Sequence, residues 1–376
     1  MKALMVILDG VGDESIASLG LKTPLSYAVH PAMDALAAQG TTGKISVSNG
    51  DFHAESLKCI LRLLGLPSAD VPANRAYIEL LAHTRDISEH EMVLRCNLVA
   101  IDAEGTLLGF NGQGLTAEEM SQAACVVDEH FSNIEFMHLS AYRNLLIMDK
   151  QPNWEALKVI KPPHESMGEQ LQELLAPIQE YSMELAYFLE QARLKLSSYD
   201  RAGLRYFLYP WGVSVRSTAP SFSRLHHGLQ GGVVCGAEIV RGMAKYLQME
   251  CPDLREATGD TDTNIQQKLT ATLQLLEHND FVLTHFNGTD EAAHRKNPRE
   301  KAEFITKIDK EFLQALLTTY KKPLKIFVSG DHGTSSITGK HTDAPVPYIA
   351  FSAQDSKCAP FKDYRDILTF MYDGRE

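Results

Sequence analysis

Three short apolar runs, each followed closely by an acidic residue, constrain the fold of this chain more than any other feature. They are residues 3–8 before Asp9, residues 281–284 before Asp290 and residues 325–328 before Asp331. Runs of this length and composition are typical of buried strands. In an α/β sheet, ligands bind outside the carboxyl ends of the strands. The sequence therefore predicts that three distant strand ends bring their polar side chains together in one crevice.

The residues that follow these runs are of the types that bind catalytic metals. Asp290 and His294 are four residues apart, so one helical turn places them on the same face. Asp331 and His332 are adjacent, and His341 lies in the next loop. Aspartate and histidine are common ligands of divalent metals, and two such metals can hold both the attacking and the leaving oxygen of a phosphoryl group. Each motif alone is frequent, but the complete set predicts a two-metal phosphoryl-transfer site.

Length and composition set the class of protein. A chain of 376 residues is long enough for a large core and two domains. No apolar stretch reaches about 18 residues, so we expect no membrane span and no membrane partner. The N-terminus lacks the pattern of a secretory signal, and the six cysteines are scattered without a CxxC pair. Both features favour a cytoplasmic protein with reduced thiols.

The charge of the chain restricts its partners. The net charge of −12 argues against nucleic acid as a partner. It does not exclude a small phosphorylated substrate, because metals and a few arginines create a local positive site within an acidic protein. The oligomeric state is not predicted by the sequence.

The order of the segments predicts an interrupted α/β core. We expect residues 1–66 and 203–376 to form this core, with a strand at 206–209 and a helix at 233–246 in its second part. Residues 67–202 have a different character and include a long helical pattern at 166–196, so we assign them to an inserted α+β cap domain. The two metal-type blocks share one site although roughly 140 residues, a typical domain's worth, separate them.

The chain resembles the archaeal-type, cofactor-independent phosphoglycerate mutases of the alkaline phosphatase superfamily. The resemblance covers nearly the whole chain, and its motifs are specific as a set. They are Thr23-Pro24-Leu25, Met33 to Ala37, Arg95 to Val99, Pro162-Pro163-His164, Trp211-Gly212, Pro220-Ser221-Phe222, Gly228-Leu229, Ala257-Thr258-Gly259, Asp262-Thr263-Asn264, Asp290 to His294 and Asp331 to His341.

The resemblance implies an alkaline-phosphatase-like core sheet with helices on both faces and an activity that interconverts 3-phosphoglycerate and 2-phosphoglycerate through a phosphoserine. It also implies two divalent metal ions, with manganese, zinc, cobalt and magnesium all compatible with these ligands. The implied ligands of one metal are Asp290, His294 and His341. Those of the other are Asp9, Asp331 and His332, together with a nucleophilic serine.

The nucleophile is where the sequence departs from the family pattern of Gly-Ser-Asp-x-Ala-Asn before a helix ending in Leu-Gly. Counting back from Leu64-Gly65 places the serine at Ser56, with Glu55, Leu57 and Ile60 at the Gly, Asp and Asn positions. A helix N-terminus offers free N–H groups to a phosphate, which suits Ser56 as the nucleophile.

Other roles remain open near this serine. Ser56 is also a plausible helix-capping residue, with Ser46 or Ser48 as the next candidates for the nucleophile. Lys58 or His53 could replace the phosphate contact that the missing Asn would make.

Substrate contacts are expected from Arg75, Arg95, Arg143 and His164, which sit in family-like positions. A guanidinium binds phosphate and carboxylate groups with two parallel hydrogen bonds. The sequence does not identify the base for the glycerate hydroxyl.

Two other functions remain compatible with the sequence. One is a metal-dependent phosphatase or phosphonate hydrolase of the same superfamily, which the altered neighbourhood of Ser56 keeps open. The other is a non-catalytic, metal-binding homologue, although its complete set of metal ligands argues against this.

Overall fold

A computed structural model of the chain describes residues 1–128, 133–354 and 357–372. The chain forms two compact units. Unit 1 consists of Met1–Val71 and Thr218–Glu376, and unit 2 consists of Pro72–Ser217. The middle of the chain is therefore inserted into a unit that both ends build.

Unit 1 contains a mixed six-stranded sheet, a two-stranded ribbon (β11 and β12) and the helices that pack around them. Its strands are β1 (Lys2–Leu8), β2 (Thr41–Ile45), β8 (Gly231–Val234), β9 (Phe281–Phe286), β10 (Leu324–Ser329), β11 (Gly333–Thr334), β12 (His341–Thr342) and β13 (Val346–Ser352). Its helices are α1 (Pro24–Tyr27), α2 (Pro31–Gln39), α3 (Ser56–Leu63), α9 (Phe222–Leu225), α10 (Glu238–Tyr246), α11 (Ile265–His278), α12 (Gly288–His294), α13 (Pro298–Ile308), α14 (Ala315–Thr319) and α15 (Tyr364–Tyr372). Short 3-10 turns η1 (Ala17–Leu19) and η2 (Ser68–Asp70) and a π-helical segment η6 (Asp309–Gln314) complete this unit.

The six-stranded sheet of unit 1 has the order β2-β13-β10-β1-β9-β8. β1 lies between β10 and β9 and runs parallel to both, with Ile7 opposite Ser329 and His285. β8 is also parallel to β9, whereas β13 is antiparallel to β10 and to β2. The carboxyl ends of β1, β9 and β10 therefore meet at one edge of the sheet.

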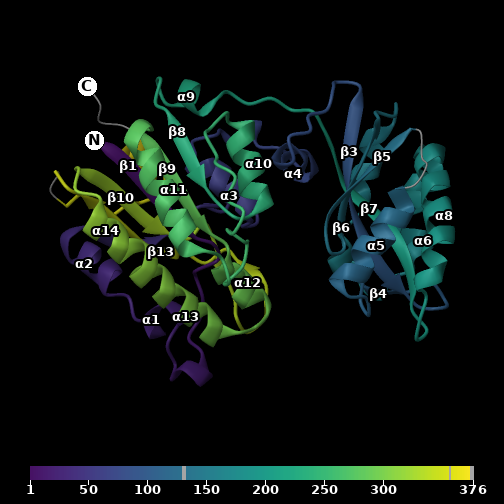
Figure 1. Cartoon of the computed structure of the whole chain (residues 1–376), viewed down its shortest axis with the longest axis horizontal. Coiled ribbons are helices and arrows are strands. Elements are labelled where there is room, and N and C mark those ends of the chain that lie inside the picture. Colours follow the sequence, from purple (N-terminus) through teal and green to yellow (C-terminus); the bar gives the residue numbers. More distant parts are fainter. Residues whose placement is uncertain (129–132, 355–356, 373–376) are drawn as a thin grey trace. The chain divides into compact units, whose positions relative to one another are not determined.

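Helices cover both faces of this sheet, which is why β1 is buried almost throughout and reads as a continuous apolar run (Figure 1). Leu4, Val6 and Leu8 pack on one face within a core that includes residues of α2, α11, α13 and η6. Phe281 points to the opposite face, where its ring lies 5.1 Å from that of Tyr372 in α15. The predicted α/β sheet with helices on both faces is confirmed.

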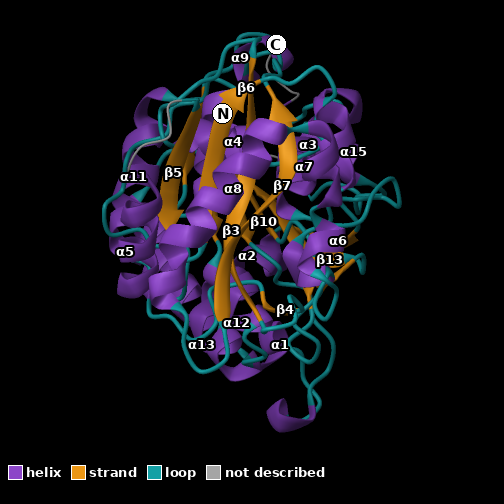
Figure 2. Cartoon of the chain, turned by 90° about the vertical axis from the view of Figure 1, so that its right-hand side faces the viewer, coloured by secondary structure: helices purple, strands orange, loops and turns teal. Residues whose placement is uncertain are grey.

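Unit 2 is an antiparallel sheet packed against helices. Its elements are α4 (Ala76–Ala82), β3 (Glu91–Ile101), β4 (Leu107–Gly109), α5 (Ala117–Asp128), β5 (Ile134–Ser140), β6 (Arg143–Asp149), η3 (Trp154–Val159), η4 (Pro163–Glu165), α6 (Leu171–Leu174), α7 (Ala176–Tyr181), α8 (Met183–Leu196), η5 (Ser197–Tyr199) and β7 (Arg205–Val215). β3 is the long central strand, paired with β4, β6 and β7. Figure 2 shows α5 and α8 lying over these strands, with which they share one hydrophobic core.

Three predicted boundaries differ from the structure. The strand predicted at 206–209 belongs to unit 2, because β7 pairs along its length with β3, with Trp211 opposite Arg95. The helix predicted at 233–246 is a strand followed by a helix, because residues 231–234 pair with β9 as β8. The helix predicted at 166–196 is divided into α6, α7 and α8: Pro177 lies in the first turn of α7, and the Ser182 side chain caps α8.

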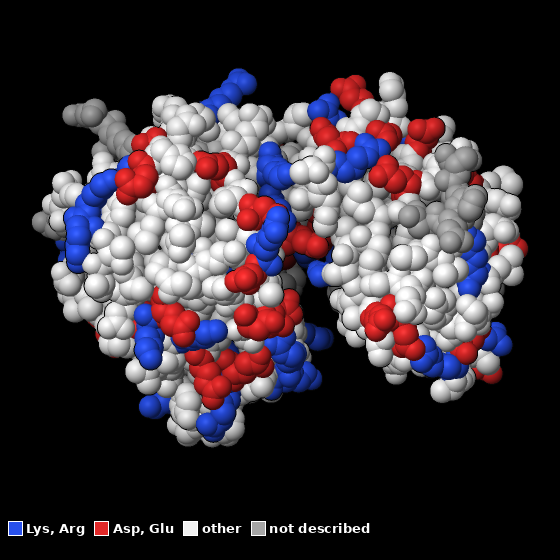
Figure 3. Space-filling model, viewed as in Figure 1, with Lys and Arg blue, Asp and Glu red and all other residues white. Residues whose placement is uncertain are grey.

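The surface is mixed in charge. On the face shown in Figure 3, small groups of acidic and basic side chains are scattered over each unit among uncharged residues. Among the described residues, no helix has both the length and the apolar composition of a membrane span.

Candidate metal centre

Three of the predicted ligands lie at the carboxyl edge of the unit 1 sheet. Asp9 follows β1 directly, Asp331 comes two residues after β10, and Asp290 lies in the helix α12 that follows β9. All three carboxylates are buried. Backbone bonds fix this edge, because the Asp9 N–H donates to the Phe286 carbonyl and the Gly10 N–H donates to Asp331 Oδ1. Strand pairing therefore brings Asp9 close to Asp290 and Asp331, which are far from it in sequence.

Asp9, Asp331 and His332 form a first buried group of ligand-type side chains. His332 Nε2 lies 3.4 Å from Asp9 Oδ1 and 3.4 Å from Asp331 Oδ2. Burial, together with the negative charges of Asp331 and Asp290, raises the pKa of Asp9 well above its ordinary value. Asp331 Oδ2 is buried and has no hydrogen-bond partner among the described residues. A divalent cation would relieve both the repulsion and the unpaired oxygen.

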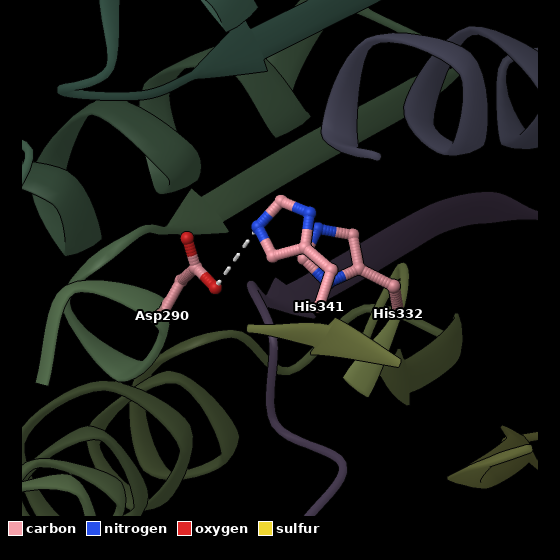
Figure 4. Close-up of side chains that lie close together, drawn as sticks. All are labelled: Asp290, His332 and His341. Carbon is pink, nitrogen blue, oxygen red and sulfur yellow. Dashed lines mark ion pairs between the residues drawn. The ribbon is translucent and has the colours of Figure 1, made fainter. Parts of the chain in front are cut away.

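A second group surrounds Asp290. His294 Nε2 lies 3.0 Å from Asp290 Oδ2, and His341 Nε2 lies 3.8 Å from Asp290 Oδ1. The two Nε2 atoms of His294 and His341 are 3.2 Å apart. Figure 4 shows Asp290, His332 and His341 converging from separate elements, and a single ligand atom from each lies within 4.8 Å of the others. His332 thus lies close to both groups.

The three histidines share one hydrogen-bonding arrangement, in which Nδ1 faces a backbone carbonyl. The Nδ1 atoms of His294, His332 and His341 lie 2.8, 3.2 and 3.2 Å from the backbone carbonyls of Gly339, Gly333 and Ala54. Donation of Nδ1–H to a carbonyl fixes the tautomer and leaves the Nε2 lone pair toward the carboxylates, as in metal-binding histidines. Nitrogen atoms about 2 Å from one tetrahedral metal lie roughly 3.3 Å apart, close to the observed spacing of His294 and His341. The donor set therefore fits divalent metals.

Protonation of this second group mimics a bound cation. The hydrogen bond to Asp290 raises the pKa of His294 to about 9. Burial alone would raise the pKa of Asp290, but hydrogen bonds from His294 and His341 hold it well below its ordinary value. The Asp290 carboxylate is therefore placed to stabilise a positive charge on or near the two histidines.

Ser56 is the first residue of α3, and Glu55 occupies the N-cap position without a capping side-chain bond. The Ser56 hydroxyl lies 3.1 Å from His332 Nε2 and 3.4 Å from each Asp9 oxygen. Of the other candidate serines, Ser46 and Ser48 bond to each other at 3.3 Å. The structure thus brings Ser56 into the first ligand group.

The residues around Ser56 do not replace the missing polar pattern. Leu57 and Ile60 are buried apolar side chains. Lys58 forms an ion pair with Glu55 at 2.7 Å, and the His53 ring lies 3.1 Å from Asp343. Both side chains that were candidates for an extra phosphate contact are therefore engaged with carboxylates.

One buried histidine at the centre was missed by sequence reasoning. His285 Nε2 lies 3.0 Å from Asp9 Oδ2, and both side chains are almost inaccessible to solvent. Burial lowers the pKa of His285 to about 4, so the neutral ring donates to Asp9. The signal in the sequence was a histidine within an otherwise apolar strand, at the position that pairs with Ile7.

The predicted substrate contacts lie in unit 2, where Arg75 and Arg95 share the buried carboxylate of Glu79. Arg75 Nε and Arg95 Nε lie 2.7 and 2.9 Å from different oxygens of Glu79. The Arg95 guanidinium also lies over the Trp211 ring, 4.3 Å from its centroid. Burial lowers the pKa of Arg95 to about 10, and the charges of Arg75 and Arg143 add to this effect. A cluster with this excess of positive charge suits an anion.

The two other predicted contacts lie around this cluster. The Arg143 guanidinium donates to Ser140 Oγ at 2.8 Å, and the His164 ring lies 6.2 Å from that of Trp211, centroid to centroid.

A family model described as the metalloenzyme superfamily matches residues 1–365. A probable 2,3-bisphosphoglycerate-independent phosphoglycerate mutase of Geobacter sulfurreducens is 28% identical, over 97% of this chain and 94% of its own length. A 2,3-bisphosphoglycerate-independent phosphoglycerate mutase of Thermococcus kodakarensis is 27% identical, over 93% of this chain and 87% of its own.

Two solved structures have the same fold. The PH0037 protein of Pyrococcus horikoshii has a TM-score of 0.77 at 22% identity, covering 100% of this chain and 98% of that one. A cofactor-independent phosphoglycerate mutase of Thermoplasma acidophilum has a TM-score of 0.56 at 20% identity, covering 94% of this chain and 91% of that one. Because the family model spans nearly the whole sequence, this chain belongs to the metalloenzyme superfamily.

Proposed function

We propose that this chain is a metal-dependent phosphotransferase that interconverts 3-phosphoglycerate and 2-phosphoglycerate without 2,3-bisphosphoglycerate. The observation that carries the proposal is the position of the Ser56 hydroxyl at the start of α3, in contact with His332 and Asp9. The names of the curated relatives support the same reaction. A serine at a helix N-terminus can both attack a phosphoryl group and hold it against free N–H groups.

Two divalent ions belong to this proposal, with manganese, zinc, cobalt and magnesium as candidates. Asp290, His294 and His341 would hold one ion. Asp9, Asp331, His332 and Ser56 would hold the other. When bound, such ions lower the pKa of a coordinated hydroxyl and stabilise negative charge on a phosphoryl group.

The side chains of the chain then have separate tasks. Ser56 Oγ attacks phosphorus and becomes a phosphoserine, and the bond between phosphorus and the glycerate oxygen breaks. The proton lost by Ser56 Oγ is balanced by the proton that the departing glycerate oxygen takes up. The glycerate turns, its other hydroxyl attacks the phosphoserine, and Ser56 is regenerated. We assign Arg75, Arg95, Arg143 and His164 to binding of the anionic groups of the substrate. Glu79 holds two of these arginines through Nε, so that their Nη groups stay available to a phosphate or carboxylate.

A hydrolase of phosphate or phosphonate esters is the second candidate function. The buried apolar side chains of Leu57 and Ile60 favour it, because they replace polar neighbours of the nucleophile in the family pattern. A hydrolase transfers the phosphoryl group of the phosphoserine to water instead of returning it to glycerate.

An assay that follows both products distinguishes these functions. Protein reconstituted with manganese is given 3-phosphoglycerate without bisphosphoglycerate, and 2-phosphoglycerate and free phosphate are measured in the same sample. Isomerisation with little phosphate is expected for the mutase. Phosphate release without isomerisation would transfer the assignment to the hydrolase, and inactivity in both channels would contradict both functions for this substrate.

A further inference from the structure

One lysine is enclosed by the loops that carry the ligands. Lys301, in α13, is fully buried, and its Nζ atom donates to the carbonyls of Gly10 and Thr334 at 2.8 and 2.9 Å. It also lies 2.9 Å from Asp13 Oδ2, and the side chain of Asp13 is equally inaccessible. A third carbonyl, of Gly12, is 3.4 Å away. No charged group is buried in this way without a large desolvation cost, so these acceptors must be held accurately around the ammonium.

The two carbonyls at 2.8 and 2.9 Å each lie one or two residues after a proposed metal ligand. Gly10 follows Asp9, and its N–H donates to Asp331 Oδ1. Thr334 lies two residues after His332, and its hydroxyl donates to Asp290 Oδ1. The Thr334 N–H in turn donates to the Gly10 carbonyl at 3.2 Å. The ammonium of Lys301 is thus the common donor for the loop after β1 and the loop after β10.

These two loops are in close contact at the point where Lys301 joins them. Gly10 has a φ of 61°, and a Cβ atom there would lie 2.5 Å from both Asp290 Oδ1 and Thr334 Oγ1. There is no room for a side chain at Gly10, so the backbones of the two segments lie in direct contact. Hydrogen bonds between them therefore set their distance. Asp13 is itself anchored, since it accepts from the N–H and the hydroxyl of Ser336.

We propose that Lys301 is a positioning residue that holds the segments after Asp9 and His332 together and, through the Thr334 hydroxyl on Asp290 Oδ1, sets the first ligand group against the second. The spacing of the two proposed metal ions would then depend on Lys301. Lys301 Nζ donates to the Gly10 and Thr334 carbonyls, and Asp13 supplies its counter-charge. The inference rests on the proposed function, since it assumes that both ion sites are filled. Among the described residues, the hydrogen bonds of Lys301 go to Gly10, Gly12, Asp13 and Thr334 and not to a candidate ligand, so Lys301 would act only through the segments that bear the ligands.

The test compares manganese binding in variants of the whole chain. Lys301→Met keeps the length of the side chain and removes the donors, Asp13→Asn removes only the counter-charge, and the double variant removes both charges. Asp309→Asn is the control, because the fully buried Asp309 carboxylate accepts from the N–H groups of Ala32 and Met33, away from the ligand loops. Stoichiometry and affinity are measured by calorimetry, and the coupling between two Mn²⁺ ions is measured by electron paramagnetic resonance.

We expect wild type and the control Asp309→Asn to bind two manganese ions with the same coupled spectrum. Asp13→Asn leaves the donors of Lys301 in place and should lose less of that coupling than Lys301→Met. Lys301→Met is expected to lose the coupled spectrum and to bind the weaker ion about 10- to 100-fold less tightly, the usual effect of removing an outer-shell contact. The double variant should resemble Lys301→Met, because neutralising Asp13 does not restore a donor to the carbonyls. If Lys301→Met does not fold, Lys301→Gln takes its place, with an intermediate loss of coupling expected.

Two results would overturn the inference. One is an unchanged coupled spectrum in the Lys301 variants. The other is recovery of that spectrum in the double variant, which would mean that only charge balance matters. A wild-type protein that binds fewer than two ions would instead contradict the proposed two-metal function, so the two failures are distinguishable.

Discussion

In the proposed metal centre, protons and divalent metals would compete for the Nε2 atom of His294. The hydrogen bond to Asp290 raises the pKa of His294 to about 9, so in the absence of metal the ring is protonated at neutral pH. A metal binds only the deprotonated Nε2, and binding must therefore release this proton. Because the pKa is raised, the competition is present below about pH 9 and disappears as the pH rises through that value.

The size of this effect follows from the pKa. One displaced proton lowers the apparent metal affinity by about tenfold for each pH unit below the pKa, which gives up to about 100-fold between pH 8.5 and pH 6.5. The His294 side chain is 38% exposed, so solvent screening makes this an upper value for one proton. Burial alone would lower the pKa of His341, but its contact with Asp290 raises it, so a second proton adds to the slope at the acid end.

Calorimetric titration with manganese at several pH values, in two buffers with different heats of ionisation, measures both affinity and released protons. About one proton per chain should be released at pH 7.5, and His294→Ala should remove this release. His278→Ala is the matched control, since His278 also pairs with a carboxylate, Glu250 at 2.7 Å, but outside the ligand groups. An affinity that does not change between pH 6.5 and 8.5, with no proton released, would refute the reasoning.

Three further substitutions test individual residues. Ser56→Ala should lower turnover by about 10³-fold or more while the Asp290 group still binds metal, as measured by steady-state kinetics and metal analysis; a wild-type rate would show that Ser56 is not the nucleophile. Asp290→Asn should reduce the bound metal to about one ion per chain by elemental analysis, and two ions would contradict the ligand assignment. Glu79→Ala should destabilise unit 2 by about 3–5 kcal/mol in denaturant unfolding, because Arg95 loses its buried partner; a change below about 1 kcal/mol would mean that Arg95 finds another.

The convergence of the main candidate ligands was predictable because their signal is local. Asp9 and Asp331 stand just after apolar runs, and parallel pairing of those runs places them at one edge. The spacing of Asp290 and His294 likewise follows from one helical turn within α12. These predictions needed only two facts: the type of each element, and that the three strands run in the same direction.

Other parts of the centre depend on contacts that no local pattern records. Lys301 lies in a helix whose charged residues read as an ordinary exposed face, and its burial arises only where two distant loops meet around it. The apolar residues of β7 are compatible with either sheet, and only the pairing of β7 with β3 assigns this strand to unit 2. For the same reason, the sequence placed the second boundary between the units at 202, whereas the structure places it after Ser217.

The central position of β1 has a consequence for how the protein is made. The ribosome synthesises β1 long before its sheet neighbours β9 and β10, which begin only at residues 281 and 324. The whole of unit 2 emerges in between and can fold while translation continues. During that time the apolar strand β1 has no partner in its sheet, and Asp9 has no companion ligands. The apolar strand β1 of the nascent chain therefore needs shielding until β9 and β10 have been translated, and the candidate metal ligands can come together only after that point.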